Sequence, residues 1–371
     1  MITKNRLAQL VDLAIAIQQI PAPTFHEAER ARFVQTCFIE QGLVDVRLDR
    51  AGNVLARLEG SRPAKAVVVS AHLDTVFPIS VDLHCEREPD RILAPGIGDN
   101  SLGVAGLFGL VWALREQHLD LAGDLWLVAN VCEEGLGDLR GIRAVVDQFG
   151  ASPLAYIILE GMALGQVYHR GLGVRRYRIT VNTSGGHSWI DYGQPSAVHE
   201  LTALSTRITA LKLSQAPRST LNIGIISGGS SVNTIAAEAM LELDLRSEDN
   251  DTLERLATQV AEIVHETRRA GVSIKMEIIG QRPSGQIPAE HPLVRLAQDC
   301  LLKVGIEPHL NIGSTDANLP LSRSIPAVTI GLTTGGGGHS VHEYINLAPL
   351  EKGMEQAVEL VSRVWEKASN D

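Results

Sequence analysis

The segment AVVVSAHLDTVFP, residues 66–78, joins an apolar run to a histidine and an aspartate two positions apart. The apolar run predicts a buried β-strand. Because side chains i and i+2 of a strand point to the same face, His72 and Asp74 are expected to emerge side by side. A strand that ends in this pair invites a search for other strands with similar ends.

Three further apolar runs are also followed by carboxylate or imidazole side chains. They are DLWLVANV (124–131) with Glu133 and Glu134, LAYIIL (154–159) with Glu160, and AVTIGL (327–332) with His339. Helical patterns separate the runs, so we expect an α/β fold with a mostly parallel sheet covered by helices on both faces. Ligands of such sheets bind beyond the carboxyl ends of the strands, which is where these side chains fall.

Residues 174–284 show a different pattern. Segments there follow the order strand–helix–strand–strand–helix–strand, which is the split βαβ arrangement. We therefore predict an inserted α+β domain over 174–284, and a discontinuous first domain over 1–173 and 285–371.

Composition and charge narrow the classes of function. Apolar residues make up 44% and charged residues 20% of the 371 residues, as in an ordinary soluble globular protein. The formal net charge of −10 argues against nucleic acid or an anionic membrane as a partner. Residues 1–20 lack the continuous apolar core of a signal peptide, and no apolar run is judged long enough to span a bilayer. We expect a cytoplasmic protein.

The side chains that follow the four runs suit a pair of metal ions. Zinc binds imidazole nitrogen and carboxylate oxygen, and a catalytic zinc keeps one position open for water. With Asp99 included, the candidates offer more ligands than one tetrahedral zinc needs, but they suit two ions that share a carboxylate. Asp99, in the glycine-bounded turn GIGDNSLG (96–103), is the expected bridge.

Three neighbouring carboxylates complete the expected chemistry. The Asp74 carboxylate is expected to orient His72 through the second ring nitrogen. Glu133 and Glu134 are adjacent and point different ways from a loop. One of them can bind metal while the other takes a proton from the attacking water.

Each candidate also has a structural alternative that needs no metal. His72 and Asp74 can form a satisfied pair in a turn, the two glutamates can lie in a solvated loop, and Asp99 can cap a helix. His342 lies close enough in sequence to compete with His339 for a ligand role. The metal interpretation therefore rests on the joint pattern.

With these residues assembled, the chain resembles the dinuclear zinc aminoacylase/carboxypeptidase family over nearly its whole length. That family includes glutamate carboxypeptidases, acetylornithine and succinyl-diaminopimelate deacylases, and tripeptidase-type aminopeptidases. The motifs that carry the resemblance are SAHLDTV, GIGDN, CEEGLGDLRG, GGHS and the late GGHSVHE. The resemblance implies five ligands of two zinc ions: His72 and Glu160 on one, Glu134 and His339 on the other, and Asp99 bridging both.

The resemblance also assigns the remaining roles. It implies that Glu133 is the general base, that Asp74 steadies His72, and that a cis peptide bond follows Asp99. The chain departs from the family at Ser101, where many members carry a basic residue. Cobalt or manganese can replace zinc at nitrogen–oxygen sites.

In the family, the inserted domain is a lid that often mediates a homodimer. By resemblance, His187 of GGHS reaches a neighbouring active site, commonly across the dimer, and stabilises the oxyanion of the tetrahedral intermediate. Asn233, Arg246 and Arg282 fall where carboxypeptidase-like members hold a substrate carboxylate. Arg246 and Arg282 also end predicted strands, where surface salt bridges are common.

The expected function is that of a dizinc hydrolase that cleaves the amide bond of small peptides or N-acyl amino acids. Two alternatives stay open. The first is an aminopeptidase that requires a free amine, as tripeptidases do. The second, of a different class, is a non-catalytic protein that binds peptides or amino acids on the same scaffold.

Overall fold

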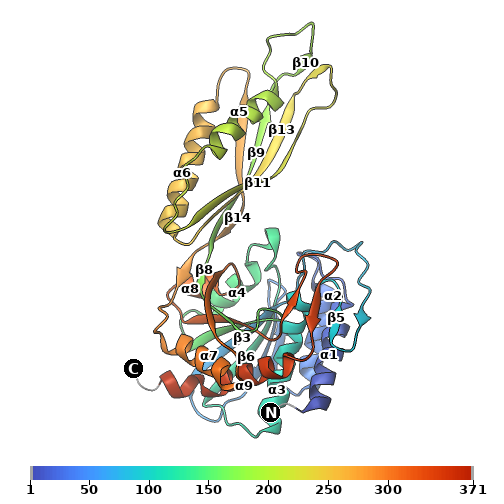
Figure 1. The fold of residues 1–371 in the computed structure, drawn as a ribbon, viewed down its shortest axis with the longest axis vertical. Helices are drawn as coiled ribbons and strands as arrows, with labels where there is room; N and C mark the ends of the chain where they lie inside the picture. Colours follow the sequence, from blue (N-terminus) through green and yellow to red (C-terminus); the bar gives the residue numbers. More distant parts are fainter. Residues whose placement is uncertain (1–2, 369–371) are drawn as a thin grey trace. The chain divides into compact units, whose positions relative to one another are not determined.

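The computed structural model describes residues 3–368, which form two compact units (Figure 1). Unit 1 comprises Met1–Gly171 and Gln286–Asp371, and unit 2 comprises Leu172–Gly285. Residues 1–2 and 369–371 lie outside the described part, so the expectation for the first 20 residues can be followed only from Thr3. Helix α1 (Lys4–Gln18) begins directly after Thr3, whose side chain accepts a hydrogen bond from the Arg6 amide.

Unit 1 is built on a mixed sheet. Its described strands in spatial order are β1 (Val44–Leu48), β2 (Val54–Leu58), β6 (Gly123–Asn130), β3 (Ala64–His72), β7 (Ala155–Glu160), β17 (Ala327–Gly331), β8 (Gln166–Gly171) and β15 (Gly285–Gln286), with β16 (His309–Gly313) beside β8. The central strands β6, β3, β7 and β17 are parallel, and they are the four strands expected from the apolar runs. The flanking strands β2 and β8 are antiparallel to their inner neighbours. Strands β1 and β2 also pair antiparallel, because the short turn over residues 49–53 cannot form a crossover.

Helices cover both faces of this sheet, which confirms the predicted α/β class (Figure 1). They are α1, α2 (Ala28–Glu40), α3 (Leu102–Glu116), α4 (Arg140–Phe149), α7 (Pro292–Lys303), α8 (Asn318–Ser322) and α9 (Leu350–Ala368). Helices α1, α3, α9 and α7 pack in a row, each against the next. Helix α4 packs through Phe149 against Trp126 of β6, with ring centroids 5.2 Å apart.

The segment Ile97–Glu116, which contains α3, corrects one expectation. By length and composition it is apolar enough to cross a membrane, whereas we expected no run of this kind. Its most apolar window is 94% buried inside the protein, because α3 packs against β3 and β7 as well as α1 and α9. Burial of this extent is typical of the core helix of a large α/β domain.

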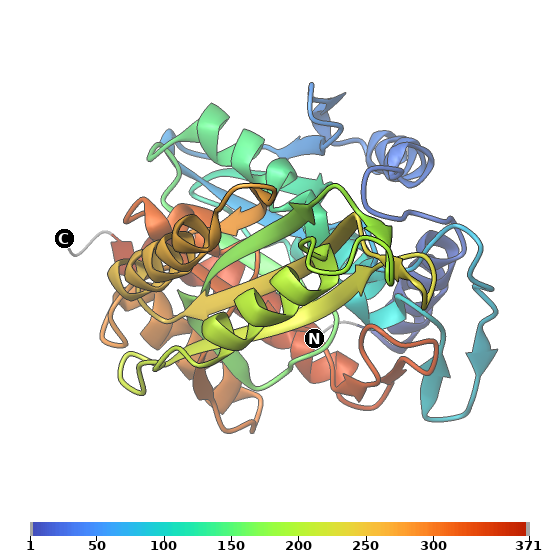
Figure 2. The ribbon, with the colours of Figure 1, turned by 90° about the horizontal axis from the view of Figure 1, so that it is seen from above.

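Unit 2 contains the strands and helices of a split βαβ arrangement (Figure 2). Its elements are β9 (Gly173–Asn182), β10 (Gly186–His187), α5 (Ala197–Thr209), β11 (Ser219–Gly228), β12 (Thr234–Ile235), β13 (Glu238–Ser247), α6 (Asn250–Thr267) and β14 (Ser273–Arg282). The sheet order is β11-β13-β9-β14, all antiparallel, and α5 and α6 pack on it through a separate apolar core. Alternate residues of β13 are buried, so Glu242, Asp244 and Arg246 lie on the other face of the sheet.

Candidate metal centre

The carboxyl ends of the central strands meet at one edge of the unit 1 sheet. His72, the last residue of β3, pairs with Asn130 at the end of β6. Glu160, the last residue of β7, pairs with Gly331 at the end of β17. His339 lies in the loop of a hairpin formed by β18 (Gly335–Gly336) and β19 (Tyr344–Asn346), which pairs with β5 (Arg91–Leu93) and β4 (Glu86–Arg87).

Asp74 connects the ends of β3 and β6. It is fully buried, and its two carboxylate oxygens accept hydrogen bonds from the backbone amides of Glu133 and Glu134, both at 2.9 Å. Nδ1 of His72 lies 3.0 Å from the backbone carbonyl oxygen of Asp74, but 3.6 Å from its carboxylate. A separation of 3.6 Å is too long for a hydrogen bond. The ring is therefore oriented by the Asp74 carbonyl, while the carboxylate fixes the turn that carries the two glutamates.

Asp99 lies in an irregular turn, Ile97–Ser101, directly before α3. The peptide bond between Asp99 and Asn100 is cis. The Asn100 side chain donates to the Leu159 carbonyl oxygen at 2.8 Å and accepts from the Gly161 amide at 2.9 Å. The turn that presents Asp99 is therefore fastened to the end of β7, on both sides of Glu160.

The two oxygens of the Asp99 carboxylate face two different imidazoles. Oδ1 lies 3.0 Å from Nε2 of His72, and Oδ2 lies 3.0 Å from Nε2 of His339. The same nitrogen of His72 is 3.8 Å from Oε2 of Glu160, and that of His339 is 3.1 Å from Oε1 of Glu134. Five side chains thus form two groups that share Asp99.

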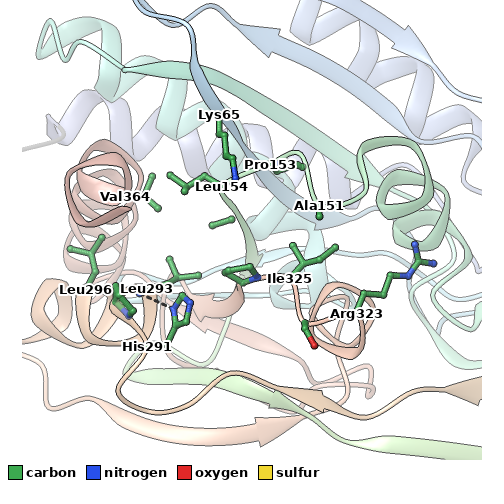
Figure 3. Close-up of a pocket in the computed structure, with 14 residues that line it drawn as sticks. Lys65, Ala151, Pro153, Leu154, His291, Leu293, Leu296, Arg323, Ile325 and Val364 are labelled. Carbon is green, nitrogen blue, oxygen red and sulfur yellow. Dashed lines mark hydrogen bonds between the residues drawn. The ribbon is translucent and has the colours of Figure 1, made fainter. Parts of the chain in front are cut away.

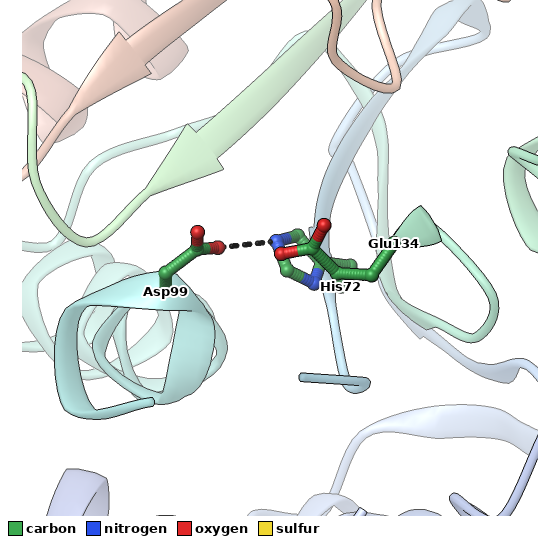
Figure 4. A group of neighbouring side chains, drawn as sticks. All are labelled: His72, Asp99 and Glu134. Atoms are coloured by element: carbon green, nitrogen blue, oxygen red, sulfur yellow. Dashed lines mark ion pairs between the residues drawn. The ribbon is translucent and has the colours of Figure 1, made fainter. Parts of the chain in front are cut away.

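Figure 4 shows His72, Asp99 and Glu134 converging on one point from three different elements. One possible ligand atom from each lies within 4.8 Å of those of the other two. His342, the competitor of His339 in the sequence, makes no ion pair with a carboxylate among the described residues. The geometry therefore distinguishes the two histidines, which the sequence spacing did not.

The electrostatics of the cluster suit a cation. Burial raises the pKa of the Glu160 carboxyl well above its usual value, and the nearby Asp99, Glu133 and Asp316 carboxylates raise it further, although His72 opposes them. Contacts with Asp99 and then Glu134 raise the pKa of His339 to about 10. Carboxylates crowded in this way around two imidazoles form a donor set that fits zinc.

Metal binding is expected to release protons. Burial would lower the pKa of His72, but contacts with Asp74 and Asp99 raise it well above its usual value, and that of His339 is about 10. Both imidazole rings are therefore protonated on both nitrogens, and positively charged, at pH 7 in the metal-free protein. A metal ion binds only the neutral ring, so each ring must lose one proton. We expect the two rings to release about two protons per chain at pH 7, in addition to any proton held by the Glu160 carboxyl, and an affinity that rises with pH until His339 is neutral near pH 10.

Calorimetry in two buffers of different ionisation enthalpy measures this release. The His339→Gln variant should release about one proton fewer, and the matched His342→Gln variant should behave as the unmodified chain. Metal uptake at pH 7 without proton release would contradict the assignment of the two rings.

Glu343 supports the Asp99 turn and was missed in the sequence. It is fully buried, and its carboxylate accepts from the backbone amides of Gly96, Gly98 and Asp99 at 3.2, 2.7 and 2.8 Å. Burial raises its pKa to about 7. The only signal in the sequence is its place at the end of GGHSVHE, next to the ligand candidates.

Arg30 and Glu27, near the start of α2, make hydrogen bonds to backbone atoms just after the ends of β3 and β6. Nη1 of Arg30 donates to the Leu73 carbonyl oxygen at 2.7 Å, directly between His72 and Asp74 in the chain. Oε1 of Glu27 accepts from the Cys132 amide at 3.0 Å, just before the two glutamates. Burial lowers the pKa of Arg30 to about 10. No local pattern in the sequence distinguishes these two residues from surface charges.

The four candidates on the substrate side all lie in unit 2, two of them at the small sheet of β10 and β12 and two near strand ends of the four-stranded sheet. Strand β10 pairs with β12, so that His187 and Asn233 lie close together, and the Ser188 amide donates to the Asn233 carbonyl oxygen. Arg246 and Arg282 both pair in register with Val174, at the start of β9. Arg246 is engaged by Asp244 at 2.7 Å, whereas Arg282 is only 4% exposed.

Comparison with known proteins identifies the family of the chain. Residues 68–366 match the sequence model of the family described as Peptidase family M20/M25/M40. The chain is 25% identical to a succinyl-diaminopimelate desuccinylase of Corynebacterium glutamicum over 93% of each chain. It is 24% identical to a peptidase T of Aeromonas hydrophila, over 87% of this chain and 88% of that protein.

The fold is also shared with solved structures. A tripeptidase from Staphylococcus aureus has a TM-score of 0.82 to this chain, at 20% identity, over 99% of this chain and 100% of that one. Peptidases and deacylases thus occur among the similar proteins. The chain belongs to Peptidase family M20/M25/M40, a family of metal-dependent hydrolases.

Proposed function

We propose that this protein is a dizinc hydrolase that cleaves the amide bond of small peptides or N-acyl amino acids. The observation that carries the proposal is the position of the Asp99 carboxylate, with one oxygen 3.0 Å from His72 and the other 3.0 Å from His339. A carboxylate that serves two separate donor groups is what a pair of metal ions requires.

The two donor groups divide the ligands between the ions. His72 and Glu160 would hold one zinc, Glu134 and His339 the other, and Asp99 both. Asp74, Glu343 and Asn100 would keep these ligands in place through the backbone contacts described above. Cobalt or manganese would fit the same nitrogen and oxygen donors.

Zinc, when bound, would supply Lewis acidity that activates water and polarises the scissile carbonyl. Glu133 would act as the general base. The residue is 5% exposed, its amide is fixed by Asp74, and its carboxylate lies close enough to Glu160 to raise the pKa of that carboxyl. It would take the proton of the attacking water and then deliver it to the leaving amine, so that one group serves both steps.

We assign the substrate side to unit 2. His187 would donate to the oxyanion, and Asn233, Arg246 and Arg282 would hold a carboxylate of the substrate. Within unit 2, Val174 lies at the start of β9 and Asn182 at its end, roughly 26 Å apart at about 3.3 Å per residue. His187 and Asn233 lie beyond the Asn182 end of β9, whereas Arg246 and Arg282 lie at the Val174 end. A single small substrate cannot span that distance, which supports a homodimer in which His187 and Asn233 of one chain serve the site of a second chain.

The location we propose is the cytoplasm. All four cysteines lie in the described part of the chain, and each is a free thiol. Free, scattered cysteines are typical of a reducing compartment.

A substrate panel tests the proposed function. The metal-loaded protein is assayed against dipeptides, tripeptides with a free or blocked amine, and N-acyl amino acids. We expect hydrolysis of at least one N-blocked substrate, with products of simple amide cleavage. Turnover of tripeptides with a free amine alone would instead make the protein an aminopeptidase. No turnover of any member, with two ions bound per chain, would favour the non-catalytic binder.

A further inference from the structure

Unit 1 contains a cavity of about 320 Å³ at the edge of the sheet opposite the metal centre. It lies where β3, β7 and β17 begin, and the start of α7 and the last turns of α9 also contribute to it. Lys65 at the start of β3 lines it, whereas His72 at the end of the same strand belongs to the metal centre. Seven residues of strand separate the two by roughly 23 Å. The cavity is therefore distinct from the site described above.

We propose that this cavity binds a small molecule with an apolar body and a single carboxylate. Its volume lies at the lower end of the range of about 300–1,000 Å³ that is usual for small-molecule sites. Such a ligand is small, comparable to a short aliphatic or a monocyclic aromatic acid.

The walls of the cavity are apolar and well packed behind their surface. Leu293 and Leu296 of α7, Ile325 before β17 and Val364 of α9 each expose 5% or less of their surface. These side chains belong to the main core of unit 1, so the cavity is framed by fixed elements and not by mobile surface chains. They favour the apolar part of a ligand.

The ionisable side chains at the cavity are all basic. Lys65, His291 and Arg323 line it, and no aspartate or glutamate does so among the described residues. This composition contrasts with the formal net charge of −10 of the whole chain. An anionic group is therefore the complement that the cavity selects.

Lys65 is the group that can hold the anion. Its ammonium group makes no ion pair within residues 3–368. Arg323, by contrast, pairs with Asp147 of α4 at 2.5 Å, and Nδ1 of His291 accepts from the Leu293 amide at 3.2 Å. Figure 3 shows the Lys65 side chain extending toward the cavity, with the guanidinium of Arg323 directed away from it. One available cation indicates a monoanion.

Binding of hexanoate to the full-length, metal-loaded protein tests the proposal. Titration calorimetry compares hexanoate with hexanamide, which has the same shape without the charge. We expect hexanoate to bind. Hexanamide should bind at least about tenfold more weakly, because it cannot form the charged hydrogen bond between a carboxylate and Lys65. Lys65→Met should weaken hexanoate binding by a similar factor. The matched control Lys352→Met, an exposed lysine elsewhere on α9, should not.

A crystal grown with 6-bromohexanoate locates the ligand, because a carboxylate can also bind at a metal centre. The proposal expects anomalous bromine density between Lys65 and Val364. Bromine density only at the metal centre, equal affinity for hexanamide, or unchanged affinity in Lys65→Met would each overturn it. None of these results depends on amide hydrolysis, so this experiment tests the cavity independently of the proposed function.

Discussion

Replacement of Glu133 by glutamine is expected to lower kcat for amide hydrolysis by about 10²–10⁴-fold, which is the usual contribution of a general base. Glutamine keeps the size of the side chain and the backbone amide that Asp74 accepts at 2.9 Å. It cannot take a proton from water, so the loss should appear in kcat. The measurement pairs steady-state kinetics on the best substrate of the panel with metal analysis of the same sample.

The metal content of this variant separates the two roles open to Glu133. A general base leaves two ions per chain in place, whereas a ligand does not. Glu307→Gln is the matched control, because Glu307 is exposed and far in sequence from the site. Wild-type kcat in Glu133→Gln, or loss of metal from it, would contradict the assignment.

Replacement of Asp99 by asparagine is expected to remove at least one of the two ions and to lower kcat/KM by about 10³-fold or more. Metal clamping of the reacting oxygens is worth several kcal/mol, which corresponds to a factor of this size. Asparagine has one carbonyl oxygen and no charge, so it cannot serve His72 and His339 as the carboxylate does at 3.0 Å on each side. Metal content and kinetics are again measured together.

Asp120→Asn provides the control for Asp99. Asp120 has a 62% exposed side chain and a distant contact with Arg62 at 3.8 Å, so its replacement should leave metal binding unchanged. The Asp99→Asn variant should also release fewer protons on metal binding, because the carboxylate that raises the pKa of both rings is absent. Two bound ions and normal kcat/KM in Asp99→Asn would contradict a bridging role.

The central strands could be predicted because burial on both faces leaves a simple signature. Residues 154–159 are continuously apolar, residues 66–71 are interrupted only by Ser70, and each run became a strand in the parallel centre of the sheet. The antiparallel edges could not be predicted in the same way. Strand β1 is short, half exposed and mixed in composition, and β2 has only three buried apolar residues, so the pairing partners define these two strands.

The convergence of polar side chains at strand ends could also be predicted, because parallel strands end at the same edge. What the sequence could not supply is the set of backbone contacts that hold the cluster. Glu343 binds amides near Asp99 across more than 240 positions, and Arg30 binds the Leu73 carbonyl oxygen across 43. A hydrogen bond to a backbone atom does not require a particular residue type at the second position. Such a contact therefore leaves no pair of side-chain types to recognise in the sequence.

The role of Asp74 shows the same limit. Its spacing from His72 correctly indicated that the two residues lie together. The spacing could not show that the carboxylate turns toward the amides of Glu133 and Glu134, 60 positions away, and leaves the ring to the carbonyl oxygen. Side-chain direction depends on the donors that the fold brings nearby, because a buried carboxylate must be hydrogen-bonded.

The most direct test of the central claim is a crystal structure of the zinc-loaded protein with anomalous data collected at the zinc edge. The account predicts two peaks, about 3.5–4 Å apart. One should lie against His72 and Glu160, the other against Glu134 and His339, with an oxygen of Asp99 on each. A single peak, or two peaks with Asp99 in contact with neither, would contradict it.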